Sequence, residues 1–230
     1  LLVASMWSMK HDAQWHVPSY AQWCEGENPV EAYRHMANLL RLIGWSQQES
    51  SLRPWILKTP QHMLDLPALL EVFPDARLIF THRDPKQVVG SAASLAWNQT
   101  IIYSDHNDPA QTGRQWLGKT ATMIERMRAA RDAIPRDRMI DVQYDDMETD
   151  WRGTMERVYR FLELDMAPAV DGMQRFLDRS ARLKRRPHRY SLAEFGLRAD
   201  EVDERFANYT ATYGIPVEGP PAPLRRRVAE

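Results

Sequence analysis

Two short apolar runs, each followed at once by polar residues and a proline, place the strongest constraint on how this chain folds. The runs are residues 55–57 (Trp-Ile-Leu) and 78–80 (Leu-Ile-Phe). Continuous apolar runs of this kind are typical of strands that are buried on both faces, as in parallel sheets. Pro60 follows the first run and Pro85 the second, and proline is favoured at the first position of a helix. The pattern therefore predicts an α/β fold in which parallel strands lead directly into helices.

The rest of the chain extends this α/β pattern. A third strand is predicted over residues 138–143, and apolar residues at helical spacing predict helices over residues 29–47, 60–72, 85–97, 110–131, 152–162, 167–180 and 200–213. No repeat or linker divides these elements, so we expect one domain over residues 1–215, with a parallel sheet flanked by helices. Residues 216–230 contain four prolines and three consecutive arginines, and we expect a loosely attached tail there.

Composition argues against several classes of function. The 30 basic and 31 acidic side chains give a net charge of −1, so bulk charge supports neither a nucleic acid nor a membrane surface as partner. Cys24 is the only cysteine, which excludes an intrachain disulfide and a cysteine metal cluster. His11, Asp12 and His16 have no further strong ligand nearby, so we expect no metal. No apolar run approaches the roughly 20 residues of a membrane span, and we expect a soluble, cytoplasmic protein.

Polar side chains follow the first two strands at the point where each strand ends. Lys58 and His62 follow the first strand, and Arg83 and Ser91 follow the second. Ligands of open α/β sheets bind at the carboxyl ends of the strands, and helix N-termini at that edge favour anions. The sequence therefore predicts that these four side chains face one crevice that holds a phosphate-bearing ligand.

These motifs resemble those of the PAPS-dependent sulfotransferases, where PAPS is 3′-phosphoadenosine 5′-phosphosulfate. Residues 83–85 (Arg-Asp-Pro), with Ser91 eight positions after the arginine, resemble the family's 3′-phosphate-binding motif. Residues 57–62 (LKTPQH) and 73–76 (FPDA) resemble flanking segments of the bacterial-type branch, and a looser similarity continues to about residue 215. The resemblance implies a fold related to that of the P-loop nucleotide kinases. It also implies sulfuryl transfer from PAPS to a hydroxyl or amine of a small-molecule acceptor, leaving 3′,5′-ADP, without a metal.

The resemblance assigns cofactor-binding roles to three residues. Arg83 and Ser91 match the positions that hold the 3′-phosphate, to which an arginine offers a bidentate fork and a serine a hydroxyl. The alternative for Arg83 is a salt bridge with Asp84 or another acid. Tyr144 stands at the end of the third predicted strand and matches a tyrosine that lies near the adenine. The alternative for Tyr144 is a tyrosine that merely ends a strand.

A basic run near the C-terminus is a further candidate for phosphate binding. In the family, a basic segment at this place folds over the 3′-phosphate, and residues 182–189 are the densest basic run in this chain. We take Arg185 and Arg186 as its contacts, with a solvated loop as the alternative reading. Residues 190–197 then resemble the family's closing segment Y-x-L-x-x-F-G-L.

Two residues are candidates for the chemical step. Lys58 matches the family's lysine beside the bridging oxygen of the donor, where a cation stabilises developing negative charge. The cytosolic branch has its catalytic histidine two residues after that lysine, but Pro60 stands there and His62 follows at four residues. Helical side chains lean toward the N-terminus, so His62 is expected to lie over the strand end as general base. The alternative for His62 is a hydrogen bond to the acceptor or to the loop, and the alternative for Lys58 is a surface charge at the strand end. His82 is the second candidate for the base.

The sequence lacks one part that the resemblance leads us to expect. Family members have an N-terminal strand and a loop containing glycine and serine or threonine, which cradles the 5′-phosphosulfate. Here no glycine precedes Gly26, and the chain starts at Leu1. We therefore expect that these residues are the C-terminal part of a sulfotransferase, and that an upstream segment supplies one more strand and a basic loop.

Two other classes of function remain open. A small-molecule kinase on a related fold is the first, although no obvious acidic cluster for Mg²⁺ stands at the predicted strand ends. A non-catalytic nucleotide-binding or interaction module is the second, because the expected phosphosulfate loop is missing.

Overall fold

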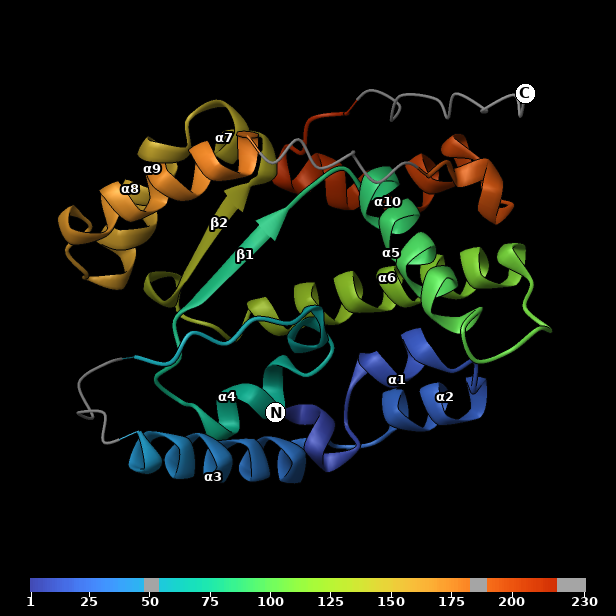
Figure 1. Ribbon diagram of the computed structural model, residues 1–230, viewed down its shortest axis with the longest axis horizontal. Coiled ribbons are helices and arrows are strands. Elements are labelled where there is room, and N and C mark those ends of the chain that lie inside the picture. Colours follow the sequence, from blue (N-terminus) through green and yellow to red (C-terminus); the bar gives the residue numbers. More distant parts are fainter. Residues whose placement is uncertain (48–53, 183–189, 219–230) are drawn as a thin grey trace.

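The computed structural model describes residues 1–47, 54–182 and 190–218 and consists mainly of helices around a small parallel sheet (Figure 1). Its α-helices are α1 (Met9–Gln14), α2 (Pro18–Gly26), α3 (Val30–Ser46), α4 (Leu66–Val72), α5 (Pro85–Thr100), α6 (Pro109–Arg131), α7 (Tyr144–Thr149), α8 (Trp151–Leu162), α9 (Ala167–Arg182) and α10 (Ala199–Tyr213). Short 3₁₀ turns are η1 (Leu2–Ser5), η2 (Pro60–Met63), η3 (Arg136–Arg138) and η4 (Leu192–Phe195).

The two strands pair in parallel, as the sequence predicts. β1 (Leu78–His82) and β2 (Met139–Gln143) are in register along their full length. In Figure 1, α7, α8 and α9 lie on the β2 side of the sheet, whereas α5 and α6 lie on the β1 side. Because the strands are parallel, both end at the same edge of the sheet, where Arg83 follows β1 and Tyr144 follows β2.

The main hydrophobic core fastens β1 to α5, α6 and α10. Most of its buried members come from these four elements, among them Phe80, Val89, Met127, Val202 and Phe206, and Leu66 of α4 joins them. A second core packs α3 against α4 through residues that include Tyr33, Met36, Leu40 and Leu69. The helices predicted over residues 29–47, 85–97, 110–131 and 200–213 are therefore present with their apolar faces inward, as their spacing requires. The helix predicted over residues 167–180 is also present, but α9 buries none of its residues.

The strand predicted over residues 55–57 is wrong. Residues 54–59 carry no strand, Trp55 is 50% exposed and Ile56 is 85% exposed. A strand is stable only beside a hydrogen-bonded neighbour, and the described part of the chain offers a sheet of β1 and β2 alone. The helix predicted over residues 60–72 is also divided into η2 and α4. Pro67 lacks an N–H and fits only at the start of a helix, so a new helix begins beside it.

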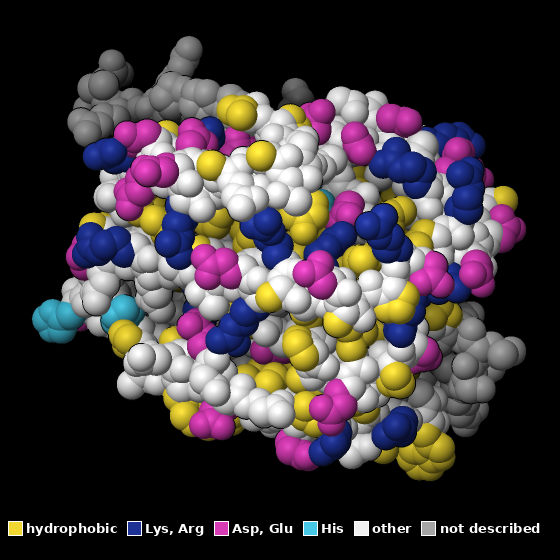
Figure 2. Space-filling model, turned by 180° about the vertical axis from the view of Figure 1, so that it is seen from behind, with side chains coloured by type: hydrophobic (Ala, Val, Ile, Leu, Met, Phe, Trp, Pro, Cys, Tyr) yellow, Lys and Arg dark blue, Asp and Glu magenta, His cyan; other side chains and the backbone are white. Residues whose placement is uncertain are grey.

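Charges of both signs cover the surface. Figure 2 shows dark blue and magenta side chains interspersed over the back of the molecule, without one large field of a single sign. This distribution matches the near-balance of 30 basic and 31 acidic residues. Among the described residues, no helix combines the length and apolarity needed to cross a membrane.

Two glycines let the segment that contains η4 lie directly on α5 and α6. A Cβ added at Gly113 of α6 would stand 2.1 Å from the carbonyl oxygen of Phe195, and one at Gly90 of α5 would stand 2.7 Å from the ring of Tyr190. Side chains other than glycine would therefore push this segment away from the two helices. The close approach places Tyr190 beside the N-terminal half of α5, next to Ser91.

A matched pair of substitutions in α6 tests this packing. Gly113→Ala should lower the free energy of unfolding by about 1–3 kcal/mol, because the methyl group overlaps the backbone of Phe195. Gly118→Ala is the control, since nothing lies within 4 Å of its added Cβ. Alanine is the better helix former by about 0.8–1.0 kcal/mol, so this variant should be as stable as wild type or more so. Urea unfolding of both variants measures the difference, and equal stabilities would contradict the packing.

Candidate active site

Arg83 presents its guanidinium fork at the end of β1, and the fork holds a carboxylate. Its Nε donates to Oε1 of Glu218 at 2.8 Å, and one terminal nitrogen donates to Oε2 at 2.9 Å. The same guanidinium lies over the ring of Tyr144, 3.9 Å from its centroid. This hydrogen bonding to Glu218 raises the pKa of Arg83, so the group stays charged. The planar fork and its aromatic support are the geometry with which arginine binds carboxylates and phosphates.

Asp84 orders the backbone on both sides of this fork. One of its carboxylate oxygens accepts the backbone N–H of Lys86 at 2.9 Å, which caps the start of α5. The other oxygen accepts the backbone N–H of Glu218 at 2.8 Å. The side chain is only 3% exposed. Asp84 thus fixes the helix start and holds the C-terminal segment where its carboxylate reaches Arg83.

Tyr190 joins the same cluster, although the sequence did not single it out as a site residue. Its hydroxyl donates to the carbonyl oxygen of Gln87 at 3.0 Å. Burial raises the pKa of Tyr190, while a hydrogen bond with Ser91 and the charge of Arg83 act to lower it. Arg83, Ser91 and Tyr144 are therefore brought to one place, with Tyr190 between the serine and the arginine. The sequence signals that could have found it are Gly90, which leaves room for the ring, and the closing segment 190–197.

His82, the second candidate for the base, is fully engaged inside the fold. It is 1% exposed, and its Nδ1 lies 2.8 Å from the hydroxyl of Tyr209. Its Nε2 lies 2.7 Å from Oδ1 of Asp141, and its ring stacks on Tyr213 at 4.4 Å. Because both ring nitrogens have partners, this histidine supports the end of β1 and offers no free nitrogen to a substrate.

His62 lies in a second cluster, which η2 and α3 form together. Its Nδ1 is 2.8 Å from the hydroxyl of Tyr33, a fully buried residue of α3. Burial lowers the pKa of His62 from 6.5 to about 4, so the imidazole is neutral at pH 7 and able to accept a proton. Lys58, four residues earlier, is exposed. Thr59 starts the turn between them, since its hydroxyl accepts the backbone N–H of Gln61 at 3.3 Å.

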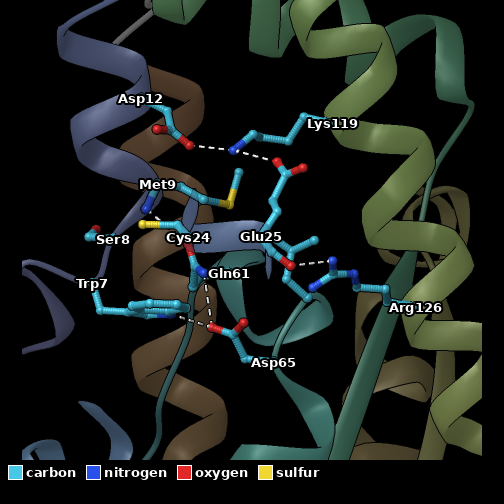
Figure 3. Close-up of a pocket in the computed structure, with 11 residues that line it drawn as sticks. Trp7, Ser8, Met9, Asp12, Cys24, Glu25, Gln61, Asp65, Lys119 and Arg126 are labelled. Carbon is cyan, nitrogen blue, oxygen red and sulfur yellow. Dashed lines mark hydrogen bonds and ion pairs between the residues drawn. The ribbon is translucent and has the colours of Figure 1, made fainter. Parts of the chain in front are cut away.

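The N-terminal segment reaches into this second cluster through Asp65. Figure 3 shows Trp7 and Gln61 converging on the Asp65 carboxylate, to which they donate at 3.0 and 2.9 Å. The hydroxyl of Tyr33 lies 3.4 Å from the same oxygen, Oδ2. Gln61 in turn accepts the backbone N–H of Met9 at 2.9 Å. Burial raises the pKa of Asp65, and the hydrogen bonds from its donors oppose that rise.

A buried ion cluster lies next to Asp65. Lys119 of α6 pairs with Asp12 and, at 3.0 Å, with Glu25, and all three appear in Figure 3. The pocket that they line has space of only about 10 Å³, which is room for about one water molecule. This pocket is therefore too small to be an acceptor site.

Part of α6 has the sequence pattern of a phosphate-binding loop but forms a helix instead. Residues 113–120 (GRQWLGKT) match the spacing G-x-x-x-x-G-K-[ST] of nucleotide-binding loops. Such a loop follows a strand and turns free backbone N–H groups toward the phosphates, whereas here all eight residues lie inside one helix. Lys119 is buried against carboxylates, and Thr120 is 3% exposed. The pattern is therefore part of the helical core and binds no phosphate.

The two predicted phosphate contacts in the basic run lie outside the residues that the structure describes. Arg185 and Arg186 lie between the described residues 182 and 190. Arg182, which begins the basic run, ends α9 and is exposed.

The chain belongs to the sulfotransferase family. The family's sequence profile matches residues 1–168, which is most of the chain. The prediction from the strand-end motifs is thereby confirmed at the level of the family, and so is the bacterial-type branch, because the relatives are mycobacterial.

Similar proteins are known both as sequences and as crystal structures. The chain is 27% identical over 179 residues to omega-hydroxy-beta-dihydromenaquinone-9 sulfotransferase Stf3 of Mycobacterium bovis, a match that covers 75% of this chain and 44% of that protein. Sulfotransferase STF1 of Mycobacterium tuberculosis is 33% identical with a TM-score of 0.78, over 90% of this chain and 53% of that one. Sulfotransferase STF9 of Mycobacterium avium is 27% identical with a TM-score of 0.80, over 92% and 54%. The chain thus spans about half the length of these relatives, and its α/β sulfotransferase fold is confirmed.

The half-buried His62 should make stability depend on pH. Its pKa is about 4 in the folded protein and 6.5 without burial, so the unfolded chain binds more protons between these values. Folding stability therefore falls as pH drops from about 6.5 toward 4, by at most about 3 kcal/mol from this residue. Urea unfolding at pH 7 and pH 4.5 should show a larger loss for wild type than for His62→Gln. An equal loss in the two proteins would refute the assigned shift.

Proposed function

We propose that this chain binds PAPS and takes part in transferring its sulfuryl group to a hydroxyl or amine of a small-molecule acceptor in the cytoplasm. Membership of the sulfotransferase family supports the reaction class. Because the chain spans about half the length of its relatives, the activity of the whole protein is part of the proposal. No metal is assigned to the reaction.

The observation that carries the proposal is the occupied fork of Arg83. A carboxylate is bound in bidentate fashion by Arg83, at the end of β1, beside a tyrosine ring and the start of α5. A phosphate group presents its oxygens to an arginine in the same way. Arg83 and Ser91 are the proposed ligands of the 3′-phosphate, and Tyr144 the proposed neighbour of the adenine. Arg185 and Arg186 remain proposed contacts of the same phosphate.

Lys58 and His62 have the properties that the chemical step requires. PAPS supplies the sulfuryl group and a leaving phosphate oxygen when it is bound. Lys58 offers an exposed positive charge with which to stabilise negative charge that develops on that oxygen. Burial lowers the pKa of His62, which keeps its imidazole neutral at pH 7 and able to take the proton of the acceptor, and the same shift makes it a weaker base than an exposed histidine.

The acceptor is proposed to be a hydroxyl on a largely apolar molecule. The name of the Stf3 relative describes an omega-hydroxy derivative of a dihydromenaquinone as its substrate. The N-terminal half of this chain exposes large apolar side chains that could contact such a molecule, among them Trp15, Trp23 and Tyr103. Aromatic side chains combine apolar contact area with a polar tip, which suits an acceptor of that kind.

Two rivals give different ligand responses. A small-molecule kinase would be stabilised by Mg-ATP, whereas a sulfotransferase would be stabilised by 3′,5′-ADP without a metal, and thermal unfolding distinguishes them. A non-catalytic binding module would bind 3′,5′-ADP and yet transfer no sulfuryl group even when joined to a phosphosulfate loop.

Calorimetric titration with 3′,5′-ADP tests the phosphate site in both directions. Arg83→Ala should weaken binding by about 1.5–3 kcal/mol, and Ser91→Ala by about 0.5–1.5 kcal/mol. Glu218 competes with the ligand for Arg83, so Glu218→Gln should strengthen binding by about 0.5–1 kcal/mol, the range of a partly exposed ion pair. Unchanged affinity in Arg83→Ala would remove the assignment.

Steady-state kinetics of an active preparation test the chemical step. Lys58→Ala and His62→Ala should each lower kcat far more than they weaken binding of 3′,5′-ADP, with a loss of about 10²–10⁴-fold for the general base. Tyr209→Phe is the control. It removes the hydroxyl that bonds His82, a histidine that is not proposed to act, and it should leave kcat unchanged. Full turnover of His62→Ala across pH 6–8 would show that His62 is not the base.

A further inference from the structure

The two ring nitrogens of His62 have different surroundings. Nδ1 lies 2.8 Å from the hydroxyl of Tyr33, whereas Nε2 has no hydrogen-bond partner within the described part of the chain. A neutral imidazole carries one proton, and the nitrogen without it is the one that accepts a proton from a substrate. The tautomer of His62 therefore decides whether the nitrogen without a partner is an acceptor.

The hydroxyl of Tyr33 controls this tautomer because it has one proton and two neighbours. If it donates to Nδ1, the ring proton must be on Nε2, and Nε2 cannot act as a base. If it donates instead to Oδ2 of Asp65, 3.4 Å away, its oxygen is free to accept a proton from Nδ1–H. Nε2 then keeps its lone pair.

Asp65 favours the second arrangement. It is 5% exposed, and its Oδ2 accepts hydrogen bonds from the N–H groups of Trp7 and Gln61, which Figure 3 shows. The hydroxyl of Tyr33 lies near the same oxygen. Burial raises the pKa of Asp65, but the hydrogen bonds from these donors oppose that rise and stabilise the carboxylate anion. An anion accepts a hydrogen bond more strongly than a neutral imidazole does. Burial and the charge of Asp65 both raise the pKa of Tyr33, so the phenol keeps its proton.

We propose that Tyr33 and Asp65 are positioning residues that hold His62 as the Nδ1–H tautomer and so leave Nε2 as the proton acceptor. The functional meaning of this arrangement rests on the proposed role of His62 as general base. In this arrangement, Nδ1–H of His62 donates a hydrogen bond to the oxygen of Tyr33, and the hydroxyl of Tyr33 donates to Asp65. Residues 7–9 belong to the arrangement, because Trp7 donates to Asp65 and the N–H of Met9 orients Gln61.

Side-chain NMR of the chain tests the tautomer directly. Two-bond ¹⁵N–¹H correlation spectra at pH 7.5 distinguish a protonated ring nitrogen from an unprotonated one, and His62→Gln identifies the signal of His62 among the seven histidines. Wild type should show a protonated Nδ1 and an unprotonated Nε2. A wild-type His62 with its proton on Nε2 would overturn the proposal, whatever the variants show.

Three variants then assign the cause. Tyr33→Phe removes the acceptor of Nδ1–H and should shift the population toward the Nε2–H tautomer, and Asp65→Asn should shift it in the same direction by removing the charge. Tyr209→Phe, which deletes the hydroxyl of the other tyrosine bonded to a histidine, should leave the His62 spectrum unchanged. An unchanged tautomer in a folded Tyr33→Phe contradicts the positioning role, and if that variant does not fold, Asp65→Asn decides. Turnover of His62→Gln is a separate result, since full activity there removes the base assignment and leaves the tautomer standing.

Discussion

The junction between β1 and α5 depends on two buried polar side chains that flank Arg83. His82 is held by Asp141 of β2 and Tyr209 of α10, so three elements meet at the last residue of the strand. Asp84 caps α5 and is 3% exposed. Because both neighbours are committed to the interior, the side chain between them is directed outward at the sheet edge, where it contacts Glu218 and Tyr144. The anion-binding geometry of Arg83 is thus a consequence of how strand and helix are joined, and the aromatic support and C-terminal segment add to it.

Histidine, tyrosine and aspartate occur together twice in this structure, with opposite chemical results. Asp141 and Tyr209 each bind one nitrogen of His82, which leaves none free. In the second group Tyr33 stands between His62 and Asp65, so that, among the residues that the structure describes, one ring nitrogen has a partner and the other does not. The first arrangement gives a support for the sheet. The second gives a neutral, half-buried imidazole with a free nitrogen, which is the form that proton transfer needs.

The phosphate-loop pattern of residues 113–120 shows why a motif needs its structural context. Its spacing satisfies the rule for a nucleotide-binding loop, yet its glycine serves close packing against Phe195 and its lysine neutralises Asp12 and Glu25. The Arg83–Ser91 motif has fewer defined positions, but it lies at a strand-to-helix junction, where the Arg83 fork is only partly buried and already holds a carboxylate. Position in the fold separates the two, because only residues at an open edge are able to meet a ligand.

The sequence by itself determined what local interactions control. The apolar runs of β1 and β2, the helix start at Asp84-Pro85 and the spacing of Arg83 and Ser91 all act within one or two turns of chain, and these predicted the parallel sheet and the family. Tertiary structure alone decided whether residues 55–57 found a strand partner and which distant residues joined the two clusters. Glu218 reaches Arg83 across 135 positions, and Tyr33 meets His62 across 29. Such contacts depend on how whole segments pack, and no local pattern of residues encodes that packing.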